Sequence, residues 1–305
     1  MNIAEYKHTV PVFWTANYLE SQSGSIGIGY VDVSSQKFST SLVEVDSLSH
    51  RFLFGVSDSK VTVPARAPYG GAWGDPAEVT GALDLFIHST NSMFGCREFE
   101  FVFPPSGFAD EIFEKQIGYL TEIGASVVCT DVSQGIDVNS WDISLFSKGN
   151  RKKLRQFLEV GGQFRRGKDS ELPMIFEILR LSRENIGAKL SISLLQLQKS
   201  FELMPDHYSA WVVTIDEKIA AVAVTVRVKK DYEYVYMWGD NLDFRNFSPT
   251  AALCEGLICE MKLLGIDFLD LGISSFRGEN NENLMRFKSN LGAVSTNKQT
   301  LNLQI

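Results

Sequence analysis

The sequence predicts an α+β protein in which helices flank mixed, mostly antiparallel sheets. Three observations support this fold class. Residues 231–238 are rich in aromatic and β-branched side chains and alternate in polarity, as a strand does. Residues 251–265 place apolar side chains at spacings of four, four and three, which is one stripe of a helix. Residues 209–240 hold three strand patterns joined by short turns, which predicts a meander.

The N-terminal half predicts a compact α+β unit of alternating strands and helices. Its expected strands are 23–33, 52–56, the start of 61–76, 96–105 and 125–133, and its expected helices are 75–95 and 108–124. Phe99, Phe101 and Phe103 alternate along one strand, so that strand buries one face.

The middle of the chain is an abrupt change in composition. Residues 148–168 carry eight cationic side chains and one acid, Glu159, which gives a local charge of +7 in a chain whose total is −8. Residues 150–161 are helical in pattern, with apolar side chains on one side and cations on the other. Two interpretations stay open: a solvated helix face that links two domains, or an anion site for phosphate or nucleic acid.

The C-terminal half continues with helices over 172–205, broken near Gly187, and then the meander. Ser248 and Pro249 are a helix-start signal, and Gly265 ends that helix. Residues 266–274 form an apolar run typical of a strand buried on both faces.

A helix, a glycine and an apolar strand follow one another in both halves, at residues 81–105 and 255–275. This layout suggests one supersecondary unit used twice. Two unrelated helix–strand units explain it as well, and both interpretations stay open.

Composition excludes several classes of protein. The apolar and charged fractions are 44% and 22%, which are typical of globular proteins, and no apolar run reaches the length of a membrane helix. The four cysteines form no CxxC pair, and no metal site or tightly bound cofactor is expected. We therefore expect a cytoplasmic protein, and nothing in the sequence indicates an oligomeric state.

Residues 141–305 resemble the GNAT (acyl-CoA N-acyltransferase) fold, in the Fem-like subgroup with two tandem domains. The resemblance lies in the basic helix 150–161, the meander 217–239, and residues 256–275 followed by 283–293. The N-terminal half resembles the first domain of that subgroup in layout. The resemblance implies two tandem GNAT-like domains, a degenerate acceptor-side domain at 1–145 and a second at 146–305.

The resemblance also implies a donor site. In this fold two central strands part and the acyl donor lies in the gap; here the strands are 231–238 and 266–273, which carry Tyr236 and Gly272. The glycine-rich phosphate loop of CoA-binding members is replaced by 245–250, with Arg245, Ser248 and Thr250, which puts acetyl-CoA binding in doubt. A capped helix start is the alternative interpretation of this segment.

Lys288, next to Phe287, matches a lysine that the subgroup places near the donor, so Lys288 is the expected catalytic residue. Arg151 and Arg155 match the basic helix of the subgroup and are expected to bind an anionic donor or acceptor. Tyr69 and Trp73, in a glycine-containing loop, are expected to line the acceptor cleft. For each of these residues a merely structural role stays open.

Two functions follow from the resemblance. The first is transfer of an acyl or aminoacyl group, from acyl-CoA or aminoacyl-tRNA, to an amine on a cell-envelope precursor, a sugar or another small molecule. The basic stretch would then contact tRNA. The second is a non-catalytic binding or scaffold protein that keeps the GNAT fold without donor binding.

Overall fold

The computed structural model describes residues 10–22, 42–45, 50–57, 59–108 and 110–305. The strand expected at 23–33 lies outside them. The chain forms two compact units, a first of Met1–Val132, Ser275–Glu279 and Thr296–Ile305, and a second of Ser133–Ser274 and Asn280–Ser295. These units differ from the predicted ranges 1–145 and 146–305, because residues 133–145 group with the second unit and the C-terminal residues with the first.

The first unit contains the following elements: η1 (Val12–Trp14), α2 (Ala16–Gln22), β1 (Leu42–Val45), β2 (His50–Leu53), β3 (Gly55–Ser57), β4 (Lys60–Val63), β5 (Ala72–Trp73), α3 (Val79–Phe94), β6 (Glu98–Val102) and α4 (Asp110–Glu122). Strands β1, β2 and β5 form one small sheet, and β3, β4, β6 and the C-terminal strand β15 (Val294–Gln304) are four neighbouring strands of a ten-stranded sheet. The pairing of β4 with β6 is parallel and that of β6 with β15 is antiparallel. The core of the first unit is aromatic. Phe99 and Phe101 of β6, and Phe103 just after it, are buried on one face, as the alternation predicts.

The second unit begins at Ser133, within β7 (Ser126–Asp137). Its elements are η2 (Ile143–Leu145), α5 (Lys148–Glu159), β8 (Gln163–Arg166), η3 (Asp169–Glu171), α6 (Leu172–Glu184), α7 (Leu194–Leu203), β9 (Tyr208–Ile215), β10 (Lys218–Lys229), β11 (Tyr232–Asp240), η4 (Leu242–Phe247), α8 (Pro249–Leu263), β12 (Phe268–Ile273) and α9 (Glu282–Ser289). Strand β13 (Ser275–Phe276) belongs to the first unit, and β14 (Glu279–Asn280) spans the point where the chain returns to the second.

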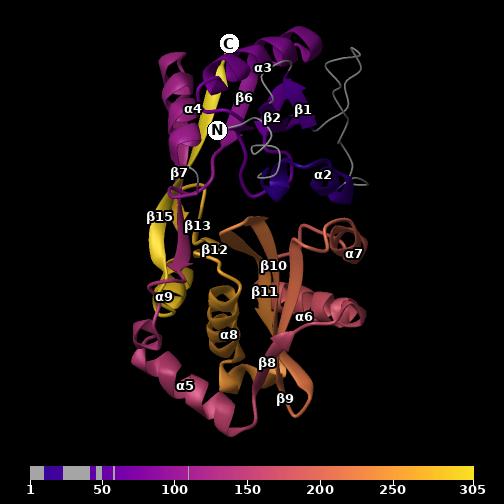
Figure 1. Cartoon of the computed structure of the whole chain (residues 1–305), viewed down its shortest axis with the longest axis vertical. Helices are drawn as coiled ribbons and strands as arrows, with labels where there is room; N and C mark the ends of the chain where they lie inside the picture. The colour runs from indigo at the N-terminus through magenta and orange to yellow at the C-terminus, as the bar shows by residue number, and fades with distance from the viewer. Residues whose placement is uncertain (1–9, 23–41, 46–49, 58, 109) are drawn as a thin grey trace. The chain divides into compact units, whose positions relative to one another are not determined.

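Six neighbouring strands of a ten-stranded sheet, in the order β7-β12-β11-β10-β9-β8, organise the second unit (Figure 1). Only the pairing of β11 with β12 is parallel among these strands. Helix α8 buries Leu253 and Leu257 against the face of the sheet that carries Ala221 and Ala223. Helix α6 covers β10 and β11 on the other face, where a side chain at Gly239 would collide with Ser182.

Most predicted elements of the second unit are confirmed: the basic helix, the break between α6 and α7, the meander β9-β10-β11, and α8 beginning at Pro249. Two elements were missed. Strand β8 lies within the charged stretch, and α9 lies where the sequence showed only a loop and a Phe-Lys pair. The α+β class with mixed, mostly antiparallel sheets is confirmed.

Candidate active site

Strands β11 and β12 run side by side for only three residue pairs and then part. The pairs are Tyr232 with Phe268, Glu233 with Leu269 and Tyr234 with Asp270. Beyond them β11 continues to Asp240 and β12 to Ile273 without further pairing to each other. The predicted gap between these two strands is therefore confirmed, and we call this place the fork.

Each strand carries a bulge where the fork opens. On β11 the register with β10 passes from Val235 to Met237, so Tyr236 is the extra residue. On β12 the register with β7 is interrupted between Asp270 and Ile273, and Gly272 adopts φ +76°, which favours glycine. Bulges locally remove ladder hydrogen bonds and bend a strand, so both strands turn aside where their pairing to each other ends.

Lys288 holds the open end of β12. Its side chain is 1% exposed, and its Nζ donates hydrogen bonds to the carbonyl oxygens of Gly272 (2.7 Å) and Ile273 (2.9 Å). Burial lowers the pKa of Lys288 to about 8, a change that the charge of Asp270 opposes and that of Arg183 reinforces. Lys288 thus satisfies two carbonyl groups at the bulge and sits at the fork as a readily deprotonated cation.

Asp270 is the buried acid of the fork. Its Oδ2 accepts from the Tyr232 hydroxyl (2.8 Å), and its Oδ1 accepts from the Gly272 N–H (2.7 Å) and the Ser133 hydroxyl (3.4 Å). Both carboxylate oxygens are therefore engaged in fixing the bulge, which suits a positioning group better than a proton acceptor.

A cleft with a volume of about 620 Å³ opens at the fork. Its walls come from β11, β12, α9, the last turn of α6 and the residues around α8, all within the second unit. The volume lies in the range of small-molecule sites. Trp238 and Phe287 face each other in its wall, with ring centroids 5.8 Å apart, and offer an apolar surface for a ligand.

The structure brings most of the expected donor-site residues to this cleft. The predicted residues that line it are Tyr236, Arg245, Thr250, Gly272, Phe287 and Lys288. Ser248 is not among the lining residues; it precedes α8 in the left-handed region, with φ 49°, and its side chain makes no capping hydrogen bond. Their donor-binding roles stay predictions.

Arg245 lies at the mouth of the cleft but is already paired. Its Nε and Nη2 donate to Asp240 at 2.8 and 3.2 Å, and these bonds raise the pKa of Arg245. A ligand anion at Arg245 would therefore have to compete with Asp240.

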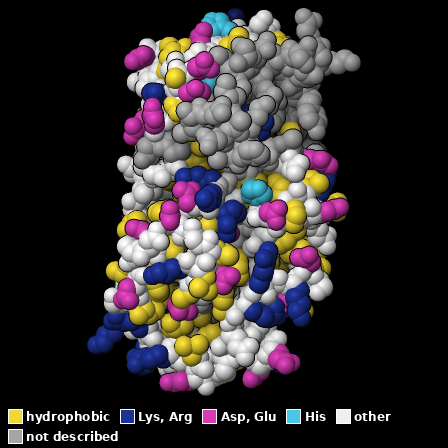
Figure 2. Space-filling model, in the orientation of Figure 1, with side chains coloured by type: hydrophobic (Ala, Val, Ile, Leu, Met, Phe, Trp, Pro, Cys, Tyr) yellow, Lys and Arg dark blue, Asp and Glu magenta, His cyan; other side chains and the backbone are white. Residues whose placement is uncertain are grey.

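The basic stretch is divided by the fold. Arg165 forms a two-bond ion pair with Glu171 (2.7 and 2.8 Å), and Arg166 donates to Ser209. On α5, four cations share one face at helical spacing: Lys148, Arg151, Lys152 and Arg155. Arg151 donates to the Ser144 carbonyl, whereas the other three are exposed and have no partner among the described residues. Figure 2 shows dark blue side chains gathered at the lower left, where α5 lies in Figure 1. The helix thus presents an exposed cationic face, as expected, and does not line the cleft.

Tyr69 and Trp73 lie in the first unit, in an aromatic cluster. The Tyr69 ring is 1% exposed and contacts Phe13 and Phe108, with centroids 5.5 and 5.2 Å away. The Trp73 ring is half-buried and lies 5.8 Å from that of Trp14. Both side chains pack the core of this unit, and their role in acceptor binding stays a prediction.

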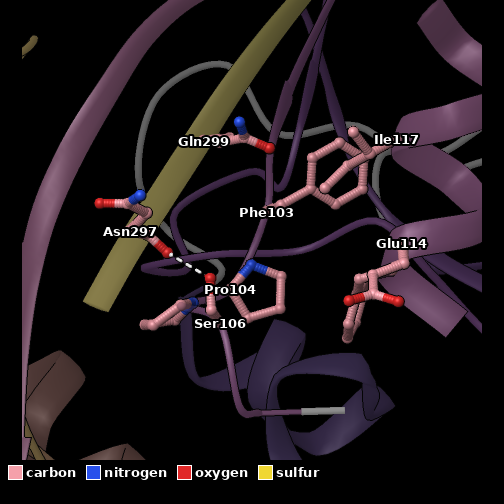
Figure 3. Close-up of a pocket in the computed structure, with 9 residues that line it drawn as sticks. Phe103, Pro104, Ser106, Glu114, Ile117, Asn297 and Gln299 are labelled. Atoms are coloured by element: carbon pink, nitrogen blue, oxygen red, sulfur yellow. Dashed lines mark hydrogen bonds between the residues drawn. The ribbon is translucent and has the colours of Figure 1, made fainter. Parts of the chain in front are cut away.

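The first unit also holds a cavity, lined in part by Phe103, Glu114, Asn297 and Gln299 (Figure 3). Its volume is only about 60 Å³, and the Ser106 hydroxyl donates to the Asn297 carbonyl at its rim (3.2 Å). A space of this size suits a water molecule or two rather than a substrate.

Within the described ranges, no three His, Cys, Asp or Glu side chains are grouped so that they could hold a metal ion. Among the same residues, every helix is too short or too polar to span a bilayer.

The sequence matches no protein-family model, and it matches the sequence of no curated protein. Solved structures do match the fold. FemX is similar over 99% of this chain and 94% of its own, with a TM-score of 0.69 and 12% identity. The chain has a Fem-like GNAT fold.

Two further structures share this Fem-like GNAT fold. The C-terminal domain of an Agrobacterium fabrum protein, named as a lysylphosphatidylglycerol synthetase, matches with a TM-score of 0.63 and 14% identity, over 87% of this chain and 84% of its own. The L-PGS of Bacillus licheniformis matches with a TM-score of 0.61 and 15% identity, over 83% of this chain and 80% of its own. Identities this low establish the fold alone. The fork coincides with the place where the Fem-like GNAT resemblance expects the donor.

Sequence reasoning missed one of the three cations that line the cleft. Arg183, in the last turn of α6, lines its wall. The only signal in the sequence was a basic residue near a helix C-terminus, which usually complements the helix dipole.

Proposed function

We propose that this chain transfers an acyl or aminoacyl group from an activated donor to an amine. The parting of β11 and β12, with both strands bulged at the gap, carries the proposal. In such a transfer the amine nitrogen attacks the carbonyl carbon of the thioester or ester. The new C–N bond forms as the C–S or C–O bond breaks, and the amine loses a proton as the thiol or hydroxyl leaves.

The fork can supply what this reaction needs. Backbone N–H groups freed by the bulge at Tyr236 would face a carbonyl placed between the strands, where negative charge develops on the oxygen. Lys288 adds a positive charge at the same level, with two of its three hydrogens engaged by carbonyl groups. The strands would also hold the donor in one orientation, which removes much of the entropic barrier to transfer.

The donor is an acyl-CoA or an aminoacyl-tRNA. Pro249 lacks an N–H at the start of α8, and Arg245 is paired with Asp240, so the usual pyrophosphate cradle is incomplete. The exposed cations of α5 suit a polyanion, which favours a tRNA donor. We propose a cell-envelope precursor, a sugar or another small molecule as the acceptor. Both donors are made in the cytoplasm, so the cytoplasmic location expected from the sequence belongs to this proposal.

The second candidate is a binding protein that keeps the fold without transfer. The incomplete pyrophosphate cradle at Pro249 and Arg245 favours it. The two candidates differ in whether a donor is consumed.

The test is transfer of radiolabelled acyl groups from acetyl-CoA and from charged bulk tRNA to a panel of amines. We expect transfer from one donor class, and a loss of about 100-fold or more in Lys288→Met. Lys230→Met, exposed in the turn between β10 and β11 and away from the cleft lining, is the matched control and should keep full activity. Binding of neither donor by the unmodified protein would instead support the non-catalytic candidate.

A further inference from the structure

Arg183 is a cation in the cleft wall that has no side-chain partner among the described residues. The three cations that line the cleft are Arg183, Arg245 and Lys288. Arg245 is paired with Asp240, and Lys288 donates to two carbonyl groups. The Arg183 side chain has no hydrogen bond or ion pair within the described part of the chain. Its guanidinium therefore keeps five donor N–H groups for a ligand.

The surroundings of Arg183 make its positive charge unfavourable in free energy when no ligand is bound. Arg183 is half-buried, and its charge acts on Lys288, a like charge, and on Tyr234. The acid that lines the cleft is Asp240, and it already accepts hydrogen bonds from Arg245 and from the Ser182 hydroxyl. Asp240 is paired with Arg245, and the buried Asp270 beside Lys288 is engaged by Tyr232 and Gly272. Arg183 is therefore left without a countercharge of its own, and an anion in the cleft would neutralise it.

The cleft has two chemically different sides. Trp238 and Phe287 pack against the core beneath α8, so the side toward α8 is aromatic. Arg183 belongs to α6, on the opposite face of the sheet, and its charge acts on Tyr234. The ring centroids of Tyr234 and Tyr236 are 6.4 Å apart. Tyr236 is half-buried, and no hydrogen bond of its hydroxyl occurs among the described residues. The side toward α6 is therefore polar and cationic, whereas Thr250 and Phe287, two of the six residues expected to bind the donor, belong to the side toward α8.

We infer that the amine acceptor carries a carboxylate or a phosphate, and that Arg183 binds this anion with paired hydrogen bonds beside the Tyr236 hydroxyl. The inference rests on the proposed function and adds the acceptor class to it. Guanidinium groups match the geometry of both anions, so the shared chemistry is a planar, two-bond contact to oxygens. The acceptor amine would then lie between this anchor and the fork.

The experiment measures binding of four small amines by calorimetry, without any donor. The probes are glycine against glycinamide, and O-phosphoethanolamine against ethanolamine, so each pair differs in the anionic group. We expect one anionic member to bind roughly tenfold or more tightly than its neutral partner. A preference within the glycine pair would identify the anion as a carboxylate, and a preference within the ethanolamine pair would identify it as a phosphate.

Variants of α6 complete the experiment. Arg183→Gln should abolish the preference and Arg183→Lys should keep part of it. Arg180→Gln should leave the preference unchanged, because Arg180 pairs with Glu177 and Glu184 outside the cleft. Equal binding within both pairs, no detectable binding of any probe, or a preference that survives in Arg183→Gln would overturn the inference. Since no donor is used, failure of transfer alone leaves this result intact.

Discussion

The Nζ of Lys288 lies 2.7 Å from the carbonyl oxygen of Gly272, sixteen residues earlier in the chain. Gly272 is the positive-φ residue of the β12 bulge, and Lys288 stands on α9. The lysine thus takes the place that a neighbouring strand would otherwise have, and the end of β12 stays ordered without closing the fork.

Replacing Lys288 by Met should loosen the end of β12. Each buried carbonyl left unpaired costs about 1–3 kcal/mol, so amides of residues 271–275 should exchange with solvent about tenfold faster or more. Global stability at pH 7 should change less, because the variant also removes the cost of burying an ammonium. Hydrogen exchange resolved by residue is the measurement, with the amides of β9 as the internal control. Unchanged exchange at 271–275 would show that Lys288 does not hold this strand.

The stability difference between the wild-type protein and Lys288→Met should depend on pH. The pKa of Lys288 is lowered to about 8 in the fold, from 10.5, because burial disfavours the ammonium. Between these values the unfolded chain binds more protons than the folded one, so the wild type gains stability as pH rises from 8 to 10.5. The gain is on the order of 3 kcal/mol. Urea unfolding of both proteins at pH 7, 9 and 10.5 measures it, and a flat difference would contradict the lowered pKa.

Gly135 on β7 should tolerate no side chain. A Cβ there would overlap the Phe268 ring and approach the Leu269 carbonyl oxygen to 3.1 Å. Gly135→Ala should therefore cost about 2–3 kcal/mol of unfolding free energy and disturb β12 below the fork. Gly149→Ala is the matched control, since its Cβ would meet only one atom, at 3.9 Å, within helix α5. A Gly135→Ala protein as stable as the control would refute the close packing of β7 on β12.

The cationic face of α5 should decide the salt dependence of tRNA binding. Changing Lys148, Lys152 and Arg155 together to Gln removes three exposed charges without touching the buried side of the helix. If tRNA is the donor, the slope of log affinity against log salt should become less steep by about 2 to 3. Filter binding with bulk tRNA across salt concentrations tests this. Lys218, Lys262 and Lys230 changed to Gln provide a control of equal charge elsewhere on the unit, and an identical effect of both triples would argue against α5 as the contact.

Local patterns predicted most elements of the second unit because they need only neighbours in sequence. The stripe of Leu253, Leu257, Met261 and Leu264 predicts α8. The first three side chains are buried in the core, whereas Leu264 follows the last helical residue and is exposed. Alternation predicts β11, and Pro249 correctly marks the first residue of α8. Helix α9 was missed because only eight residues form it, and its Asn281 cap gave a weaker signal than the polar loop around it.

The candidate site was predicted in part, through a motif and not through geometry. Lys288 and Phe287 were expected from their order after β12, and both line the cleft. Arg183 could not be distinguished from an ordinary helix-ending cation, because its importance lies in having no side-chain partner in the part of the chain that the structure describes. Arg245 was expected to be available for a ligand, and Asp240 could not be recognised as its partner five residues away.

The sequence by itself determined the α+β class, the order of helices and strands, and the concentration of positive charge on α5, since periodicity and composition are local properties. Only the tertiary structure decided that β11 and β12 part after Tyr234 and Asp270, that Lys288 is buried against Gly272, and that Arg183 faces the same space. Those relationships depend on hydrogen bonds between backbone groups that lie far apart in the sequence, and on which side chains become buried. A local sequence pattern specifies neither the hydrogen bonds nor the burial.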